Sequence, residues 1–501
     1  MDTLINTKAF GKNDIRGIFP SEVNSKIFYL AAKGYVQFVL DELEKNNKKQ
    51  NARDLLFTVC MDARTHSLEL KNAIVQGITS TGANILDLGL APTPLGYYSE
   101  FAKIEPEITQ NKKIQGALIV TASHNPKEYN GLKMTFNRQS LNENQIKEIK
   151  RLTEEIAQNE VNYRQVITGF CKSYDIISNY QEKIYNMFGT IGRYSDKKIK
   201  VVIDSANATG GIVAPQLYRD LGCEIVELFS EPNGAFPNHH PNPSDLKTLS
   251  AITKKVKETK ADFGIAFDGD SDRIGVIDET GIPLTGDKLL LIYAKDLIEN
   301  LKIHGETANV VSEVKCSQVL YDTINNLGSN AIMTKTGHGY IKSKMKETNA
   351  ILAGEMSGHI FFKDRYFGYD DAIYAGCRLI EIVAKNKTKN PKFKLTDLID
   401  EFNKVYLSDE CRIKCPNEFK KDVLEQLKTL VNDKLFNSKI KEIITIDGLR
   451  ILFDDGFALI RQSNTEPIFT LRFEAKTKEK CEHYENTLIN LVNKLIQNIT
   501  S

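Results

Sequence analysis

Residues 117–126 of the chain are Ala-Leu-Ile-Val-Thr-Ala-Ser-His-Asn-Pro. The apolar run at 117–120 is typical of a buried strand, and the proline after the polar residues ends that strand in a loop. Ser123 and His124 are therefore predicted at the carboxyl end of a strand, which is where open α/β sheets bind their ligands. A serine next to a histidine also suggests a nucleophile.

Strand and helix patterns alternate on both sides of this stretch. The predicted helices are 26–45, 67–81, 143–157, 212–221, 286–301 and 370–385, and the predicted strands are 54–60, 84–88, 117–120, 199–204, 224–228, 263–267 and 274–277. This alternation is typical of layered α/β domains, and it divides the chain up to about residue 395 into three similar blocks.

The chain beyond about residue 393 has a different pattern. Residues 386–392 are polar and charged, carry a proline and predict a linker. Residues 443–453 suggest antiparallel strands around the turn Asp447-Gly448, and residues 478–499 predict an amphipathic helix. We therefore expect a smaller C-terminal α+β domain, with domain limits at 1–168, 169–281, 282–395 and 396–501.

The composition excludes several classes of function. The 66 basic and 65 acidic residues give a net charge of +1, which argues against a nucleic acid or a membrane surface as partner. No signal peptide is evident, and no apolar run reaches the about 20 residues that span a bilayer. The eight cysteines are scattered without a CxxC pair, which disfavours a structural zinc site or a disulfide framework. The expected location is the cytoplasm.

Residues 268–273, Asp-Gly-Asp-Ser-Asp-Arg, lie between two predicted strands. Three carboxylates on one loop repel each other, and a divalent cation would offset that repulsion. Oxygen ligands alone favour Mg²⁺ or Ca²⁺ over zinc. A calcium-binding EF-hand is disfavoured because Arg273 stands where its sharp turn needs glycine, and because the flanks predict strands. Arg273 instead suits a phosphate oxygen shared with the ion. The alternative is a solvated acidic turn.

Four further loops carry polar groups suited to a ligand. Residues 461–467 combine one cation with hydroxyl and amide donors, which suits an anion cradle or an ordinary polar turn. In the loop 354–359, two glycines permit close approach of a ligand, and Glu355 and Ser357 can bind sugar hydroxyls; the alternative is a tight turn. Residues 14–17 could hold a phosphate or cap a helix. Residues 336–340 could place His338 in a cleft, although a lone histidine is more often structural.

The loops at 123, 268, 355 and 461 resemble, in their order and spacing, those of the α-D-phosphohexomutase family. The segments 129–133, 236–241 and 314–317 also resemble the family. Met356 and the segment 361–371 are similar to the phosphomannomutase/phosphoglucomutase branch, whereas the glucosamine branch usually carries glutamine in place of Met356. The chain departs from the branch at Gly11 and Asn13, where many members carry arginine and tyrosine.

The resemblance implies three similar mixed-sheet α/β domains and a smaller C-terminal α+β domain around a central cleft. It implies an enzyme that interconverts hexose 6-phosphate and hexose 1-phosphate through a phosphoserine. Ser123 would carry the phosphoryl group, and Mg²⁺ would bind Asp268, Asp270, Asp272 and the phosphate on Ser123. Hexose 1,6-bisphosphate would serve as intermediate and activator.

The resemblance also implies roles for individual residues. The expected catalytic residues are Ser123, His124, Lys133, Arg16 and His338, with Arg273 as a phosphate contact beside the metal. The expected substrate-binding residues are Glu355, Ser357, Lys315, Arg461, Ser463, Asn464 and Thr465. The partner would be a mannose or glucose phosphate. We expect a monomer, with a dimer as the alternative.

Three other functions compete with the mutase. A phosphoglucosamine mutase would use the same chemistry on another sugar. A metal-dependent phosphatase of the haloacid-dehalogenase kind would use Asp268 as nucleophile and Asp270 as acid, and would not need Ser123. A sugar-phosphate sensor that kept the fold without catalysis is disfavoured, because the nucleophile and the three aspartates are all present.

Overall fold

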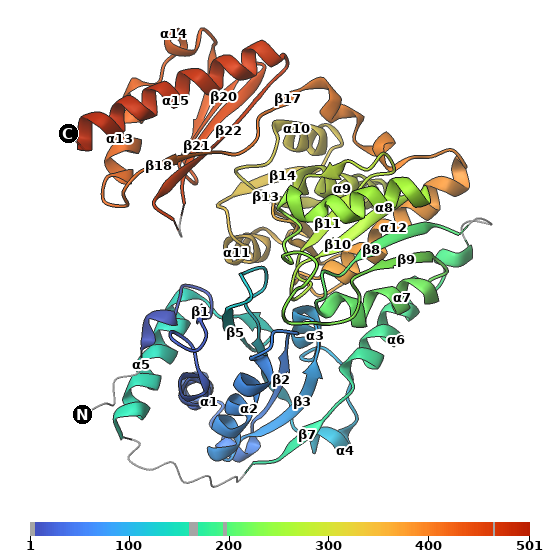
Figure 1. The fold of residues 1–501 in the computed structure, drawn as a ribbon, viewed down its shortest axis with the longest axis vertical. Coiled ribbons are helices and arrows are strands. Elements are labelled where there is room, and N and C mark those ends of the chain that lie inside the picture. Colours follow the sequence, from blue (N-terminus) through green and yellow to red (C-terminus); the bar gives the residue numbers. More distant parts are fainter. Residues whose placement is uncertain (1–5, 160–168, 194–197, 464–465, 501) are drawn as a thin grey trace. The chain divides into compact units, whose positions relative to one another are not determined.

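The computed structural model describes residues 6–159, 169–193, 198–463 and 466–500, and Figure 1 labels its helices and strands. The chain divides into two compact units. The first unit comprises residues 1–284, 358–360 and 369–394, and the second comprises residues 285–357, 361–368 and 395–501. The described parts of the chain form four β-sheets, two in each unit. Among the described helices, none is both long and apolar enough to cross a membrane.

The first sheet has the strand order β1-β5-β4-β2-β3-β7, and β6 pairs with β5. Strands β2, β3, β4 and β7 run parallel, whereas β5 runs antiparallel to both β1 and β4. The strands are β1 Ile15–Ile18, β2 Leu56–Met61, β3 Asn84–Leu90, β4 Ile114–Val120, β5 Tyr129–Phe136, β6 Gln139–Ser140 and β7 Cys171–Ser173. The accompanying helices are α1 Ser25–Lys45, α2 Ser67–Ser80, α3 Thr93–Tyr98, α4 Pro106–Thr109, α5 Glu143–Asn159 and α6 Ile176–Phe188.

Helices α1, α2 and α5 supply one side of a hydrophobic core, and the apolar residues of the first sheet supply the other. Every residue of β4 is buried. Because both faces of β4 are covered, its last four residues, 117–120, form a continuous apolar run rather than an alternating one. Only its carboxyl end leads into a polar loop, and that loop carries Ser123.

The second sheet has the order β12-β11-β10-β8-β9, with β8, β9 and β10 parallel and β11 antiparallel to β10. The strands are β8 Lys200–Asp204, β9 Glu224–Leu228, β10 Phe263–Phe267, β11 Ile274–Ile277 and β12 Pro283–Leu284. Helix α8, Ser250–Thr259, packs on β8 and β10, and helix α7, Ala214–Asp220, packs on β9. The carboxyl end of β10 leads into the loop of three aspartates.

Helix α12, Ala372–Lys389, belongs to the first unit although residues of the second unit precede and follow it in the chain. It contacts α6 and β11. Tyr218 of α7 donates to the carbonyl oxygen of Ile373 at 2.9 Å, and Tyr180 of α6 donates to the Asp371 carboxylate at 2.9 Å. Asp371 also caps the helix by accepting from the Tyr374 N–H at 2.9 Å.

The third sheet lies in the second unit and has the order β14-β13-β15-β16. Strand β13 runs parallel to both β14 and β15. The strands are β13 Asn309–Glu313, β14 Asn330–Thr334, β15 Leu352–Gly354 and β16 Ile360–Phe362, and the helices are α9 Gly286–Ile303, α10 Gln318–Asn326 and α11 His338–Thr348.

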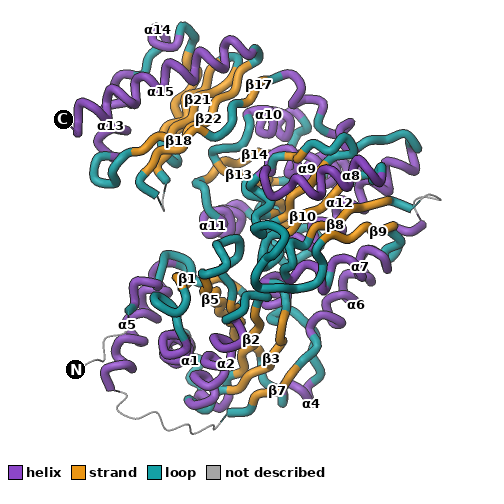
Figure 2. Tube along the Cα trace, viewed as in Figure 1, coloured by secondary structure: helices purple, strands orange, loops and turns teal. Residues whose placement is uncertain are grey.

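The fourth sheet is antiparallel, with the order β17-β22-β21-β20-β19 and β18 also paired to β22. Its strands are β17 Tyr406–Leu407, β18 Cys411–Lys414, β19 Ile440–Ile444, β20 Leu449–Phe453, β21 Gly456–Gln462 and β22 Ile468–Ala475. The helices are α13 Lys420–Leu430, α14 Asp433–Phe436 and α15 Lys478–Thr500. Helix α15 lies along this sheet and packs on β21 and β22 (Figure 2).

One sequence prediction about an element is wrong. The predicted linker at 386–392 is helical as far as Lys389, because α12 continues through its polar residues. Of the two alternatives for residues 14–17, the helix cap is excluded, because residues 15–18 form the strand β1. The Asp447-Gly448 turn is confirmed, since β19 and β20 pair antiparallel on either side of it. All eight cysteines are free thiols.

Candidate active site

Ser123 lies three residues beyond the end of β4 and has a backbone φ of +49°. Residues other than glycine adopt this left-handed conformation only at a cost. The Ser123 N–H donates to Thr121 Oγ1 at 2.8 Å. Its Oγ donates to Asp268 Oδ2 at 2.8 Å and lies 3.1 Å from His124 Nδ1. The strained turn thus directs the serine oxygen at the aspartate loop.

The aspartate loop connects β10 to its antiparallel neighbour β11, with Phe267 and Ile274 paired across it. Asp268, Asp270 and Asp272 are all buried, and each offers one carboxylate oxygen within 4.8 Å of the others. Thr93 at the start of α3 donates to Asp270 Oδ2 at 2.6 Å. The contact fixes this carboxylate to the first α/β domain.

The residues of the loop fit a divalent cation. All the donors are carboxylate or hydroxyl oxygens, which hard ions such as Mg²⁺ and Ca²⁺ prefer. The Oδ1 atom of Asp270 is buried and has no hydrogen-bond partner among the described residues. An orphaned anionic oxygen in such a place is costly unless a cation or a hydrogen bond meets it.

Lys133 of β5 contacts two of the aspartates directly. Its Nζ lies 2.7 Å from Asp270 Oδ2 and 2.5 Å from Asp272 Oδ2. Burial on its own would lower the pKa of Lys133, but the charges of Asp270 and Asp272 raise that pKa well above its usual value. Lys133 is therefore an ammonium ion that offsets part of the acidic charge.

The aspartates do not share their charge equally. Burial, followed by the charges of Asp272 and Asp270, raises the pKa of Asp268 well above its usual value. Burial also opposes ionisation of Asp272, but Lys133 and His359 outweigh it and hold the pKa of Asp272 well below its usual value. Asp268, the carboxyl beside Ser123, is thus the one whose ionisation an added cation would favour most.

Two arginines and a histidine surround the serine. Arg16 of β1 donates to Asn125 Oδ1 at 2.9 Å and forms an ion pair with Asp14 at 2.5 Å. Arg273 Nε lies 3.9 Å from Asp268 Oδ2. Burial, aided by Arg273 and Arg16, lowers the pKa of His124 to about 2. The imidazole beside Ser123 Oγ is therefore neutral, and its surroundings disfavour protonation of the ring.

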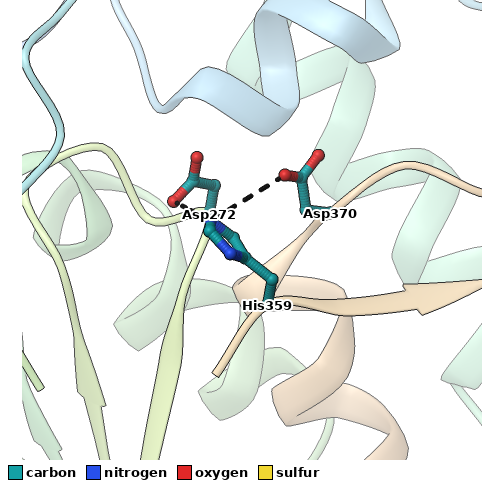
Figure 3. A group of neighbouring side chains, drawn as sticks. All are labelled: Asp272, His359 and Asp370. Atoms are coloured by element: carbon teal, nitrogen blue, oxygen red, sulfur yellow. Dashed lines mark ion pairs between the residues drawn. The ribbon is translucent and has the colours of Figure 1, made fainter. Parts of the chain in front are cut away.

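His359 and Asp370 also reach the aspartate loop, although neither was among the predicted site residues. Figure 3 shows the His359 ring between the carboxylates of Asp272 and Asp370. Its Nε2 lies 3.3 Å from Asp272 Oδ1 and 4.0 Å from Asp370 Oδ2. Arg273 Nε also approaches His359 Nε2 at 3.3 Å. Both residues lie in segments that resembled the family, so their position in those motifs was the available signal.

The second unit holds the predicted sugar and phosphate residues, several of them joined through one turn. Arg461 at the end of β21 donates from Nε to Asp447 Oδ2 at 2.9 Å, and the Thr336 N–H donates to the same oxygen at 3.1 Å. The next N–H, of Gly337, donates to Glu355 Oε1 at 2.8 Å. A chain of hydrogen bonds thus runs from the arginine loop to the glutamate loop. His338 begins α11 directly after it.

Of the remaining predicted residues of this unit, the structure describes Lys315, Ser357 and Ser463, which lie on loops. Lys315 Nζ is 3.8 Å from Glu313 Oε2 and 3.7 Å from Glu410 Oε2. Ser463 accepts on its Oγ from the Glu466 N–H at 3.1 Å. Ser357 is half-buried on the loop after β15. Asn464 and Thr465 lie outside the described residues.

The chain matches four consecutive domains of one family. They are described as phosphoglucomutase/phosphomannomutase alpha/beta/alpha domain I at residues 7–160, domain II at 178–281, domain III at 285–405 and the C-terminal domain at 410–491.

Relatives match over nearly the whole chain. A phosphomannomutase/phosphoglucomutase of Pseudomonas syringae pv. tomato is 35% identical over 95% of this chain and 93% of its own length. A phosphoglucomutase of Neisseria gonorrhoeae is 35% identical, covering 96% of each chain. The crystal structure of a phosphoglucomutase/phosphomannomutase family protein of Burkholderia thailandensis superposes with a TM-score of 0.83 at 30% identity, covering 98% of each chain.

Proposed function

The chain belongs to the phosphoglucomutase/phosphomannomutase family, and on that premise we propose that it interconverts hexose 6-phosphates and hexose 1-phosphates through a phosphoserine at Ser123. The resemblance and the fold class that the sequence predicted are both confirmed. The protein is an enzyme of the phosphohexomutase class.

One observation carries the assignment of Ser123. Its buried Oγ lies 2.8 Å from Asp268 within a group of three buried carboxylates. The ammonium of Lys133 offsets only part of the charge of these carboxylates. A divalent cation would neutralise the remaining charge, and a phosphoryl group on that oxygen would be a ligand of the cation. Asp268, Asp270 and Asp272 would hold Mg²⁺ with the phosphate, and the ion would offset the charge of the phosphoryl group during transfer.

The reaction is two phosphoryl transfers through one serine. In the first, a hydroxyl of the hexose phosphate attacks phosphorus, the bond from phosphorus to Ser123 Oγ breaks, and a hexose 1,6-bisphosphate forms. The bisphosphate turns end over end. Ser123 Oγ then attacks the other phosphate, which restores the phosphoserine and releases the isomeric monophosphate. Atoms balance over the cycle, so hexose 1,6-bisphosphate acts as intermediate and activator.

The attacking hydroxyl must lose a proton in the first transfer. Arg16, Lys133, His124 and His338 are the candidate residues for this step. The Nδ1 of His124 lies 3.1 Å from Ser123 Oγ, but burial lowers the pKa of this ring to about 2 and makes it a weak base. Lys133 as an ammonium ion, and Arg16 and Arg273 as guanidinium ions, stabilise the negative oxygens of the transferring group.

The second unit supplies the residues that we assign to the rest of the substrate. Glu355 and Ser357 would bind sugar hydroxyls, and Lys315 would add positive charge on the substrate side. Arg461, Ser463, Asn464 and Thr465 would bind the phosphate that does not react. Because the bisphosphate is nearly symmetric, the same residues serve both orientations. The hydrogen-bond chain from Arg461 through Asp447 to Glu355 supports a joint role for these loops.

The direct test is an assay of mannose 1-phosphate and glucose 1-phosphate side by side, with Mg²⁺ and a trace of hexose 1,6-bisphosphate. We expect conversion of at least one of the two to its 6-phosphate. Ser123→Ala is the matched control and should be inactive. Conversion of neither sugar by the wild type would overturn the proposed substrates, and full turnover by Ser123→Ala would favour a phosphatase-like use of Asp268.

Two further expectations remain proposals. We expect a monomer, which size-exclusion chromatography with light scattering would distinguish from a dimer. We also expect a cytoplasmic protein, which the eight free thiols support because reducing compartments keep cysteines unpaired.

A further inference from the structure

Arg64 lies in the loop after β2, and its side chain is fully buried. Its Nε donates to Asp62 Oδ2 at 3.1 Å. Its two Nη atoms donate to four backbone carbonyl oxygens, those of Ser123 at 2.8 Å, Asn125 at 2.7 Å, Pro126 at 2.6 Å and Tyr129 at 3.0 Å. All five N–H donors of the guanidinium are therefore accounted for within the protein.

Three of the four carbonyl groups belong to the loop between β4 and β5 that carries Ser123, and the fourth belongs to Tyr129, the first residue of β5. The backbone there is left-handed at Ser123, so the chain turns sharply and its carbonyl oxygens converge on one side. Converging carbonyl dipoles repel each other, and a rigid planar cation with forked donors offsets that repulsion. The guanidinium lies on this carbonyl side, whereas Ser123 Oγ points to Asp268.

Arg64 is itself held in place from two sides. Asp62 accepts from Ser67 Oγ at 2.6 Å and from the Arg64 N–H at 3.0 Å, which fixes the carboxylate that binds Nε. On the other side, the ring of Phe236 lies 5.4 Å from the guanidinium carbon. A Cβ at Gly234 would come within 2.7 Å of Arg64 Cα, so this segment of the second α/β domain packs directly on the arginine backbone.

We propose that Arg64 is the positioning residue that holds the Ser123 loop in the geometry required for phosphoryl transfer. The inference rests on the proposed function of Ser123. Arg64 does not act on the phosphate, because its donors are used by backbone carbonyls and Asp62. It acts through the loop, by fixing where Ser123 Oγ stands relative to Asp268.

This role predicts a loss of rate rather than of substrate affinity. Phosphoryl transfer needs the attacking and leaving oxygens in line, and a displacement of about 1 Å can cost about 100-fold in rate. Lysine has one compact charge with three donors and cannot hold four carbonyl groups and a carboxylate. We expect Arg64→Lys to lower kcat about 100-fold and to leave KM for the hexose phosphate nearly unchanged.

The experiment measures transfer of a labelled phosphoryl group from Ser123 to hexose 1-phosphate in a single turnover. Wild type, Arg64→Lys and Arg64→Ala are compared with Arg378→Lys, which replaces an equally buried arginine of α12 away from this loop. We expect slow transfer in both Arg64 variants, recovery of Arg64→Ala by added guanidinium but not by methylammonium, and transfer close to the wild-type rate in Arg378→Lys.

Several results would overturn the proposal: wild-type transfer by Arg64→Lys, equal effects of guanidinium and methylammonium, or an equal loss in Arg378→Lys. If both Arg64 variants fail to fold, Asp62→Asn loosens the arginine without removing it; a reduced transfer rate with unchanged KM is then expected, and a wild-type rate would count against the proposal. Absence of any transfer in the wild type would instead contradict the proposed function.

Discussion

Lys133 shows how one residue balances the charge of the candidate active site. Its ammonium lies within 2.7 Å of Asp270 and 2.5 Å of Asp272, and all three side chains are buried. Removal of one partner from a buried ion pair leaves an uncompensated charge, which typically costs about 3–5 kcal/mol. The same carboxylates are the proposed ligands of Mg²⁺, so lysine and metal neutralise the same groups.

Lys133→Gln should therefore lower the thermal unfolding temperature in the presence of a chelator, and Mg²⁺ should restore more stability to this variant than to the wild type. Lys71→Gln is the control, because Lys71 is a buried lysine that forms an ion pair with the partly exposed Asp87 outside the aspartate loop. The control should be destabilised without any added response to Mg²⁺. An equal Mg²⁺ response in Lys133→Gln and wild type would contradict the shared role.

Glu474 of β22 gives a prediction about pH. Burial, together with the charge of Asp287, raises its pKa from 4.5 to about 7, although Ser317 and Arg450 act in the opposite direction. The folded protein therefore binds a proton at Glu474 more tightly than the unfolded chain does, and this binding stabilises the folded state. The stabilisation is complete below about pH 4.5 and is lost as the pH rises through about 7. The full change is about 3 kcal/mol.

Glu474→Gln imitates the protonated carboxyl at every pH. The difference in free energy of unfolding, variant minus wild type, should therefore increase by about 3 kcal/mol between about pH 4.5 and about pH 8. Urea unfolding at the two pH values measures the difference directly. Parallel pH profiles for the two proteins would show that Glu474 is ionised in both states and would refute the assignment.

At the residue scale, the sequence identified side chains that belong to recognisable motifs. Ser123 and the three aspartates stand in such motifs, and the structure places them together. The role of Arg64 could not be predicted, because four of its acceptors are backbone carbonyl groups. Every amino acid has such a group, so the sequence does not mark these contacts. His359 ends the loop 354–359 but had no predicted role, because its contact with Asp272 arises only in the folded chain.

At the scale of elements, helix α12 packs unusually closely on the second α/β domain. A Cβ at Gly376 would lie 2.0 Å from Tyr218 Oη and 2.8 Å from Tyr218 Cζ. Alanine is the better helix former by about 1 kcal/mol, but overpacking of a buried contact costs about 1–3 kcal/mol. We therefore expect Gly376→Ala to destabilise the protein despite the gain in helix propensity.

A double-mutant cycle with Tyr218→Phe tests this contact. The second change removes the hydroxyl nearest to the new methyl group, so Gly376→Ala should cost less in the Tyr218→Phe background, by about 1 kcal/mol in urea unfolding. Additive effects of the two substitutions would mean that the helix shifts away from α7 and that the close contact does not limit its packing.

Hydrophobic periodicity located most helices and strands but not their partners. The pattern predicted a helix at residues 370–385, yet a pattern cannot tell which sheet a helix covers. The structure places α12 with the first unit, although the elements on either side of it in sequence belong to the second. The linker prediction at 386–392 failed for a related reason, since Asn386–Lys389 are polar yet continue the helix.

At the scale of the whole molecule, buried arginine and lysine side chains donate hydrogen bonds to the backbone of several loops that carry proposed site residues. In the first unit, Arg64 holds the loop of Ser123. In the second, Arg450 donates to the carbonyl oxygens of Val314 and Cys316, on either side of Lys315. Lys420 donates to the carbonyl oxygens of Ser463 and Glu466 at 3.1 and 2.6 Å. Cations therefore fix loops that have no regular hydrogen bonding of their own.

The central claim concerns the whole enzyme: a phosphoryl group on Ser123 passes to the substrate and returns. The most direct measurement charges the protein with labelled hexose 1,6-bisphosphate, removes free label and adds unlabelled mannose 1-phosphate or glucose 1-phosphate. The account predicts that label leaves Ser123 within one turnover and appears at the 6-position of the sugar, with no labelling of Ser123→Ala. Label that appears as inorganic phosphate before any on the sugar, or on Asp268 in place of Ser123, would contradict it.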